Sequence, residues 1–166
     1  MIHAVLYEPE IPQNTGNIMR TCAAFGISLH LIEPLGFYLD EAHLKRAGLD
    51  YRELVSWKLW PDWETFEKEN HGSFYFLTRY GTKPPDAFDY TGEEDLYFIF
   101  GKESTGIPKE ILRSHRDQCI RIPMKPEARC LNLSNTAAIV LYEACRQRGY
   151  SDLSFEDVFK PGILEP

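Results

Sequence analysis

Short apolar runs alternate with segments of helical periodicity along most of this chain. Compact runs rich in aliphatic and aromatic residues predict strands, and apolar residues spaced i, i+3, i+4 predict helices. The predicted strands are 3–7, 28–32, 54–59, 74–78, 96–100 and 119–122. The predicted helices are 16–25, 39–47, 63–69, 108–114 and 133–148.

Several helix ends carry their own signals. Gly26, Gly48 and Gly149 follow predicted helices and are typical of C-caps. Asp62 is placed to cap the helix at 63–69, and Pro108 suits a first helical turn. The alternation predicts an α/β fold, with a mostly parallel sheet flanked by helices. The length of 166 residues fits a single domain, 1–166, with an irregular C-terminal tail at 151–166.

Three polar segments stand out against this pattern: Pro9–Gly26, Phe100–Pro108 and Arg121–Asn135. The second and third directly follow predicted strands. If those strands are parallel members of one sheet, the segments meet at the carboxyl ends of the strands, where open α/β sheets bind ligands. The sequence therefore predicts a site at this edge.

Composition narrows the class of protein. Apolar residues make up 43% and charged residues 26%, and no apolar run approaches the ~20 residues of a membrane helix. The first ten residues predict a strand rather than a signal peptide, so we expect a cytoplasmic protein without a membrane partner and with reduced thiols. The four cysteines and five histidines are scattered, which predicts no metal site.

The net charge of −7 argues against a generic nucleic-acid binder, which usually carries a basic face. The charge is nevertheless uneven. Residues 101–130 carry seven basic and four acidic side chains, a local balance of +3. A local contact with a polyanion is compatible with this balance, and so is an ordinary solvated surface.

The first polar segment combines an arginine with asparagines. Asn14 or Thr15 is placed to cap the helix, whose inward face carries Ile18 and Cys22, while Arg20 lies on another face. An arginine near the end of the first strand suits a phosphate or a developing oxyanion. The alternative is a solvent-facing arginine on a surface helix.

The second and third segments add glycines, an acid and amides. Gly101 and Gly106 allow close approach to a ligand or tight turning, and Glu103 lies between them. The segment is neither a P-loop nor a dinucleotide fingerprint. In the third segment, helix capping explains one of Asn132, Ser134 and Asn135, but not all three. Neither a catalytic triad nor a carboxylate pair is evident, which favours metal-free group transfer from an activated donor.

The helix at 133–148 is apolar on more than one side. One stripe contains Leu133, Ala137, Val140, Leu141 and Ala144, and a second contains Ala138, Tyr142 and Cys145. A helix this apolar is covered on more than one face. The second stripe faces either a partner chain or the interior of the monomer.

Together, the three segments resemble the three motifs of the SPOUT superfamily of RNA methyltransferases. The matching stretches are NTGNIMRTCAAFG at 14–26, FGKESTGI at 100–107 and IPMKPEARCLNLSN at 122–135. The match spans nearly the whole chain. The short length and the phrase LYEPEIPQNTGNI resemble the TrmL (YibK-like) group, tRNA (cytidine/uridine-2′-O)-methyltransferases that act on the wobble nucleotide, position 34.

The resemblance implies an α/β knot fold whose C-terminal part is threaded into a trefoil knot, an exception to the rule against knots. It also implies a homodimer in which each active site is completed across the interface, with Tyr142 at that interface. The implied methyl donor is S-adenosyl-L-methionine, without a metal, and the implied partner is the tRNA anticodon loop, with tRNA-Leu isoacceptors as expected substrates. The residues implied to bind the donor are Leu77, Thr78, Gly101, Ile122, Met124, Cys130 and Leu131.

The same resemblance implies catalytic roles for Arg20, Asn14, Glu103 and Asn132. An arginine is a poor general base, so Arg20 is expected to stabilise the emerging 2′-oxyanion and to grip the adjacent phosphate. Cys130 departs from the pattern, because related enzymes often carry serine there. The alternatives are methylation of ribosomal RNA or of another tRNA position, an RNA-binding protein without catalysis, and a small-molecule enzyme with a nucleotide ligand.

Overall fold

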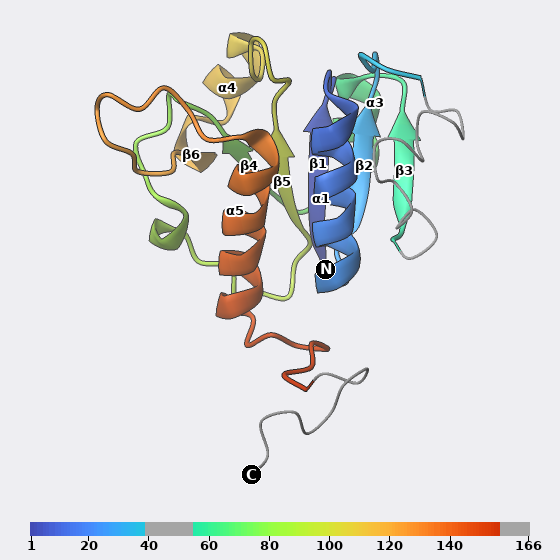
Figure 1. The fold of residues 1–166 in the computed structure, drawn as a ribbon, viewed down its shortest axis with the longest axis vertical. Coiled ribbons are helices and arrows are strands. Elements are labelled where there is room, and N and C mark those ends of the chain that lie inside the picture. The colour runs from blue at the N-terminus through green and yellow to red at the C-terminus, as the bar shows by residue number, and fades with distance from the viewer. Residues whose placement is uncertain (39–54, 157–166) are drawn as a thin grey trace.

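The computed structural model describes residues 1–38 and 55–156. Its centre is a six-stranded sheet in the order β3-β2-β1-β5-β4-β6 (Figure 1), and every pair of neighbouring strands is parallel. The strands are β1 (Ile2–Tyr7), β2 (Ser28–Ile32), β3 (Trp57–Trp60), β4 (Ser73–Leu77), β5 (Leu96–Phe100) and β6 (Cys119–Ile120). The helices are α1 (Pro12–Phe25), α3 (Trp63–Glu69), α4 (Lys109–Ser114) and α5 (Leu133–Gln147), with short 3₁₀ turns η2 (Pro85–Ala87) and η3 (Arg116–Gln118).

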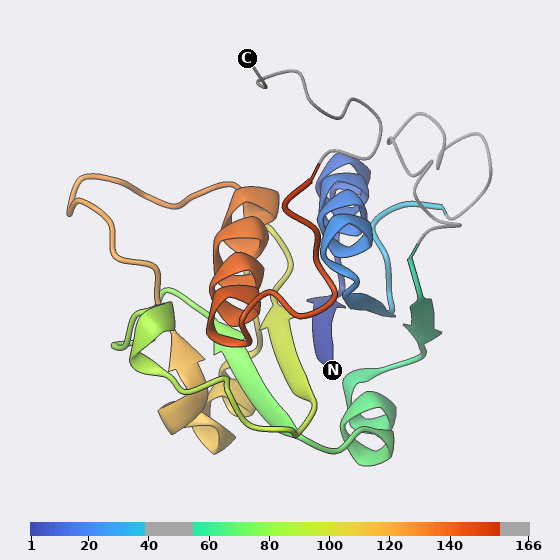
Figure 2. The ribbon, with the colours of Figure 1, turned by 90° about the horizontal axis from the view of Figure 1, so that it is seen from below.

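The helices cover both faces of the sheet, as Figure 2 shows. Alternate strand residues point to opposite faces. Leu6 and Phe98 pack with Ile18 of α1 and Val140 of α5 on one face. On the other face, a second cluster of strand residues packs against Phe66 of α3 and Leu112 of α4. The predicted α/β fold with helices flanking a parallel sheet is therefore confirmed.

The order of the strands creates a switch point between β1 and β5. The chain moves outward from β1 through β2 to β3 in one direction, and β5 and β4 lie on the other side of β1. Leu6 of β1 is in register with Phe100 of β5, so the loops that follow these strands leave the sheet side by side. Crevices of this kind are where open α/β sheets bind ligands.

Most predicted elements are present, with shifted ends. The first helix begins at Pro12 rather than residue 16, so the proposed capping role of Asn14 or Thr15 is wrong: Ile11 occupies the N-cap without a side-chain hydrogen bond. Gly26 does end this helix in the left-handed region, at φ 64°. Asp62 caps α3 by accepting from the Thr65 amide, as predicted.

Three further boundaries differ. Pro108 is the N-cap of α4 rather than part of its first turn. β3 begins at Trp57, which is later than predicted, and β6 ends at Ile120, which is earlier than predicted. The predicted helix at 39–47 lies outside the described residues. The described part of the tail, 151–156, forms neither helix nor strand, as predicted, and its Leu153 packs against the core.

On the face of the sheet that α3 covers, ring nitrogens of three neighbouring strands form a hydrogen-bonded row: His3 of β1, His30 of β2 and Trp60 of β3. The indole Nε1 of Trp60 donates to His30 Nδ1 at 2.9 Å, and His30 Nε2 lies 3.0 Å from His3 Nδ1. Because His30 Nδ1 accepts from Trp60, a neutral His30 carries its proton on Nε2. This Nε2–H group donates a hydrogen bond to His3 Nδ1. Burial is the main cause that lowers the pKa of His30 to about 4, with His3 and Lys58 adding to it.

Candidate functional site

Two loops that leave the sheet at the switch point are bonded to each other. Lys102 Nζ, after β5, lies 2.6 Å from a carboxylate oxygen of Glu8, after β1. The backbone amide and the hydroxyl of Ser104 each donate to the Glu10 carboxylate at 2.8 Å. These bonds lower the pKa of Glu10, with the Ser104 hydroxyl as the largest cause. The pKa of Lys102 is raised, chiefly by its bond to Glu8.

Glu103 lies between these two pairs and supplies the acceptor that α1 lacks at its own N-terminus. Its carboxylate accepts from the Glu10 amide at 2.9 Å, the Ile11 amide at 3.3 Å and Asn14 Nδ2 at 2.9 Å. A carboxylate at a helix N-terminus satisfies unpaired amides and complements the helix dipole. In this arrangement Glu103 holds the first polar segment against the second.

Asn14 joins the third segment to the other two. Its Oδ1 accepts from Asn132 Nδ2 at 3.0 Å, while Asn132 Oδ1 accepts from the Ser134 amide at 2.8 Å and from the Ser134 hydroxyl. The donors run in one direction, from Ser134 through Asn132 and Asn14 to Glu103. Asn132 is also the N-cap of α5, so helix capping explains one of the amides in this segment, as predicted.

Glycines shape the loop after β5. A Cβ on Gly101 would lie 2.4 Å from the backbone of Gly106 and Ile107. Gly106 adopts φ 74°, a region that favours glycine, and its amide donates to the Lys102 carbonyl at 2.8 Å. Of the two uses predicted for these glycines, the tight turn is the one that the structure displays.

A cavity of about 570 Å³ opens beside this junction, at the carboxyl ends of β4, β5 and β6. It is large enough for a ligand of nucleoside size. Its lining brings together ten of the eleven residues predicted for the site: Asn14, Leu77, Thr78, Gly101, Glu103, Ile122, Met124, Cys130, Leu131 and Asn132.

Much of what this cavity offers is backbone. Within the described part of the chain, Ile122, Met124, Cys130 and Leu131 make no hydrogen bond through their amide or carbonyl groups. These open groups lie beside apolar side chains, an arrangement that suits a nucleoside-like ligand. Cys130 itself is exposed.

Arg20 is the predicted residue that the structure does not bring into this cavity. It lies on α1 six positions after Asn14, which places it roughly 9 Å further along the axis and about 120° around it. Asn17, Arg20 and Ala24 share one exposed face of the helix, whereas Asn14 is buried. The separate face for Arg20 is as predicted, whereas Asn14 lies inside the helix rather than at its cap.

Several residues of the site were not predicted from the sequence. Arg79, Arg121 and Lys102 line the cavity and make its rim basic. Glu8 and Glu10 belong to or adjoin the first polar segment, but only the fold pairs them with Lys102 and Ser104. A charged residue directly after an apolar strand is the one signal that could have drawn attention to Lys102.

The described residues show neither a metal-binding group nor a membrane-spanning helix. No group of three or more His, Cys, Asp or Glu side chains is arranged to hold a metal ion there. Among the same residues, no helix has the length and hydropathy needed to cross a membrane.

Comparison with known proteins gives consistent results. The model of the family described as SpoU rRNA Methylase matches residues 1–142. A relative from Bacillus subtilis (strain 168) is 54% identical over 155 residues, which cover 92% of this chain and 96% of the relative. A relative from Escherichia coli (strain K12), named tRNA (cytidine(34)-2′-O)-methyltransferase, is 46% identical over 159 residues, covering 95% of this chain and 100% of its own.

A solved structure described as giving structural insights into the 2-OH methylation of C/U34 on tRNA is also similar. It superposes with a TM-score of 0.80 at 42% identity, and the match covers 89% of this chain and 95% of that one. Family, relatives and fold therefore agree over nearly the same residues.

Proposed function

The chain belongs to the SpoU rRNA Methylase family, a part of the SPOUT superfamily, and from this membership we propose that it methylates the ribose 2′-hydroxyl of nucleotide 34 of tRNA. The proposed donor is S-adenosyl-L-methionine and the proposed target a cytidine or modified uridine in the anticodon loop. The observation that carries the proposal is the junction of Asn14, Glu103 and Asn132 beside the cavity. It joins all three motif segments at one point.

The cavity fits the proposed donor. Leu77, Ile122 and Leu131 offer apolar surface for an adenine ring, and the open backbone groups around Met124 and Cys130 offer hydrogen bonds. Backbone contacts of this kind make the replacement of a family serine by Cys130 tolerable. When bound, S-adenosylmethionine supplies a methyl group already activated by its sulfonium, so the proposed reaction needs no metal.

The protein's own part is to position and to stabilise charge. The carboxylate of Glu103 has three hydrogen bonds to the first segment, so we assign it a positioning role. Asn14 and Asn132 keep the segments in register and line the cavity, where they can contact the substrate. Correct positioning of reacting groups contributes roughly 7–11 kcal/mol in favourable cases.

Arg20 is proposed to stabilise the 2′-oxyanion and to bind the neighbouring phosphate. Its place on the exposed face of α1 fits a site completed by a second copy of the chain. Ile139 and Tyr142 of α5 are about half exposed, at 46% and 50%, and Phe155 is 87% exposed. An apolar face of this kind supports the proposed homodimer, in which Arg20 serves the partner's cavity.

The trefoil knot remains a prediction from the family, and the single domain and the cytoplasmic location remain predictions from the sequence. The first test is transfer of labelled methyl from S-adenosylmethionine to a total tRNA pool, followed by nuclease mapping. We expect label in a 2′-O-methylated nucleotide at position 34 of tRNA-Leu isoacceptors. Label at another tRNA position, or in ribosomal RNA offered in a parallel reaction, would contradict the assigned target. Binding of S-adenosylmethionine without any methyl transfer would favour an RNA-binding protein without catalysis. If S-adenosylmethionine does not bind at all, a small-molecule enzyme with another nucleotide ligand would be favoured.

A further inference from the structure

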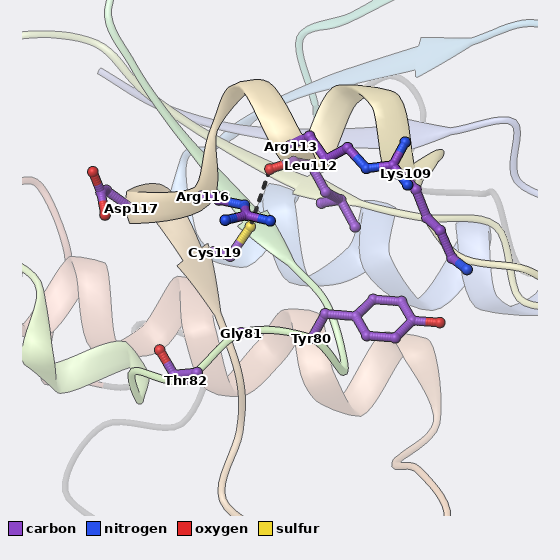
Figure 3. Close-up of a pocket in the computed structure, with 9 residues that line it drawn as sticks. All are labelled: Tyr80, Gly81, Thr82, Lys109, Leu112, Arg113, Arg116, Asp117 and Cys119. Carbon is purple, nitrogen blue, oxygen red and sulfur yellow. Dashed lines mark hydrogen bonds between the residues drawn. The ribbon is translucent and has the colours of Figure 1, made fainter.

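A second cavity, of about 420 Å³, lies between α4, η3, β6 and the loop at 80–82. None of the residues predicted for the site lines it. Its lining combines cations, one aromatic ring and an apolar floor (Figure 3). The members that matter are Tyr80, Lys109, Leu112, Arg113, Arg116 and Cys119.

The three cations are weakly engaged by the rest of the protein. The Arg116 guanidinium makes no hydrogen bond or ion pair with any described residue, and Lys109 Nζ lies 5.9 Å from the centre of the Tyr80 ring. Arg113 lies 3.4 Å from Glu110 in an exposed pair, which contributes little to stability. Asp117 also lines the cavity but points away from the cations in Figure 3. The cavity therefore holds an excess of positive charge in a protein of net charge −7.

Tyr80 connects this cavity with the first. It lines both of them, and 58% of its surface is exposed. Arg79 Cζ lies 5.6 Å and Lys109 Nζ 5.9 Å from the centre of its ring. The loop beneath it is pressed against β6, since a Cβ on Gly81 would lie 2.7 Å from the carbonyl carbon of Ile120.

The floor of the cavity is apolar and well defined. Leu112 and Cys119 are buried, and the Cys119 thiol donates to the His115 carbonyl at 3.4 Å. A flat base can stack on the exposed ring of Tyr80 beside this floor, while phosphates meet the cations at the rim. An aromatic ring flanked by cations is the usual means of binding single-stranded nucleic acid.

We infer that this second cavity is an RNA subsite, which binds the nucleotides flanking the methylated one by stacking on Tyr80 and by phosphate contacts to Lys109, Arg113 and Arg116. The inference rests on the proposed function for its ligand, RNA. A strand that presents its ribose at the first cavity reaches the second by passing Tyr80. The subsite gives a protein of acidic net charge a local surface for a polyanion.

The test is equilibrium binding of a total tRNA pool to the full chain between 50 and 300 mM salt, with steady-state methyl transfer measured in parallel. The variants are Arg116→Gln, Arg113→Gln/Arg116→Gln and, for stacking, Tyr80→Leu. Lys68→Gln is the matched control, because Lys68 is an exposed cation on α3. Thermal unfolding verifies that each variant is folded.

We expect Arg116→Gln to weaken RNA binding by about threefold to tenfold and to reduce the slope of log K against log salt by about 0.7 for each lost phosphate contact. The KM for tRNA rises and kcat stays within about twofold. Tyr80→Leu weakens RNA binding by about fivefold or more. Lys68→Gln binds RNA with unchanged affinity and salt slope. Arg116→Gln binds S-adenosylmethionine with unchanged affinity.

Equal RNA affinity and equal salt slope for Arg116→Gln, the double variant and Lys68→Gln would overturn the subsite. An absence of RNA binding by the unaltered protein would overturn it as well. Because binding is read without turnover, an unaltered protein that binds RNA through these cations but transfers no methyl would contradict the proposed function and leave the subsite standing.

Discussion

Asn14 Nδ2 donates to Glu103 Oε1 at 2.9 Å, although 89 residues separate the two in the sequence. The bond joins the segment after β1 to the segment after β5 across the switch point of the sheet. Asn132 adds the third segment through Asn14 Oδ1. The functional proposals therefore depend on one small polar network, and the network gives them testable consequences.

Glu103→Gln should destabilise the fold and impair methyl transfer together. The carboxylate accepts three hydrogen bonds. In the glutamine variant, the side-chain NH₂ group replaces one of the accepting oxygens and faces N–H donors with which it cannot bond. We expect a loss of about 1–3 kcal/mol in the free energy of unfolding, measured by denaturant titration. Glu110→Gln, an exposed acid on α4, is the control and should change stability by less than about 0.5 kcal/mol. Unchanged stability in Glu103→Gln would argue against the positioning role.

Substitutions at Asn132 can separate its role as the N-cap of α5 from its hydrogen bond to Asn14. Asn132→Ala loses both the cap of α5 and the bond to Asn14, and should cost about 1 kcal/mol from the cap alone. Asn132→Asp keeps an acceptor for the Ser134 amide but loses the donor to Asn14 Oδ1. It should therefore retain more stability than the alanine variant while transfer is still impaired. Full transfer by the aspartate variant would show that the Asn14 contact is dispensable.

Arg20→Ala should lower kcat by about 10²–10³-fold while S-adenosylmethionine binding, measured by calorimetry, stays unchanged, because Arg20 is outside the cavity lining. Mixing this variant with Asn132→Ala tests where Arg20 acts. Mixed dimers should recover part of the activity if Arg20 serves the partner's cavity. No recovery, with mixed dimers present, would place Arg20 in the site of its own chain.

Ile139→Arg should prevent dimer formation without unfolding the monomer. Ile139 is 46% exposed on α5, so the charge meets solvent in a monomer but would be buried in the proposed interface at a cost of several kcal/mol. Sedimentation velocity should report a monomer, and methyl transfer should be lost with it. A dimer of unchanged affinity would exclude this face as the interface.

Stability should fall at acid pH because of His30. Its pKa is lowered to about 4 in the folded state, against about 6.5 in the unfolded chain. The unfolded chain therefore binds more protons as the pH falls. Neutral His30 therefore makes its full contribution to the free energy of unfolding above pH 6.5. Between pH 6.5 and about pH 4 this contribution falls by about 2–3 kcal/mol.

The measurement for His30 is the free energy of unfolding at pH 7.5, 6, 5 and 4.5. His30→Gln removes the titrating group, and its stability should vary less over this interval than that of the unaltered protein. Carboxylates contribute to both proteins equally and cancel in the difference. Parallel pH profiles for the two would contradict the assignment to His30.

The sequence by itself determined the fold class and most elements. Parallel strands that are buried on both faces are largely apolar. β5 is apolar throughout and β2 is apolar apart from Ser28 and His30, and both were predicted with their observed ends. Local signals such as Gly26 and Asp62 act within one helical turn and need no knowledge of the fold. The resemblance of the three polar segments, in their order and spacing, to the motifs of the SPOUT superfamily was also enough to indicate a methyltransferase of this family.

The tertiary structure decided what depends on residues far apart in sequence. Periodicity could not show that Glu103 supplies the missing acceptor at the start of α1, because that pairing depends on β1 and β5 being neighbours. Nor could it place Tyr80 between two cavities, or pair His30 with Trp60. Spacing along a chain constrains a side chain only within its own element, and strand order decides which elements meet.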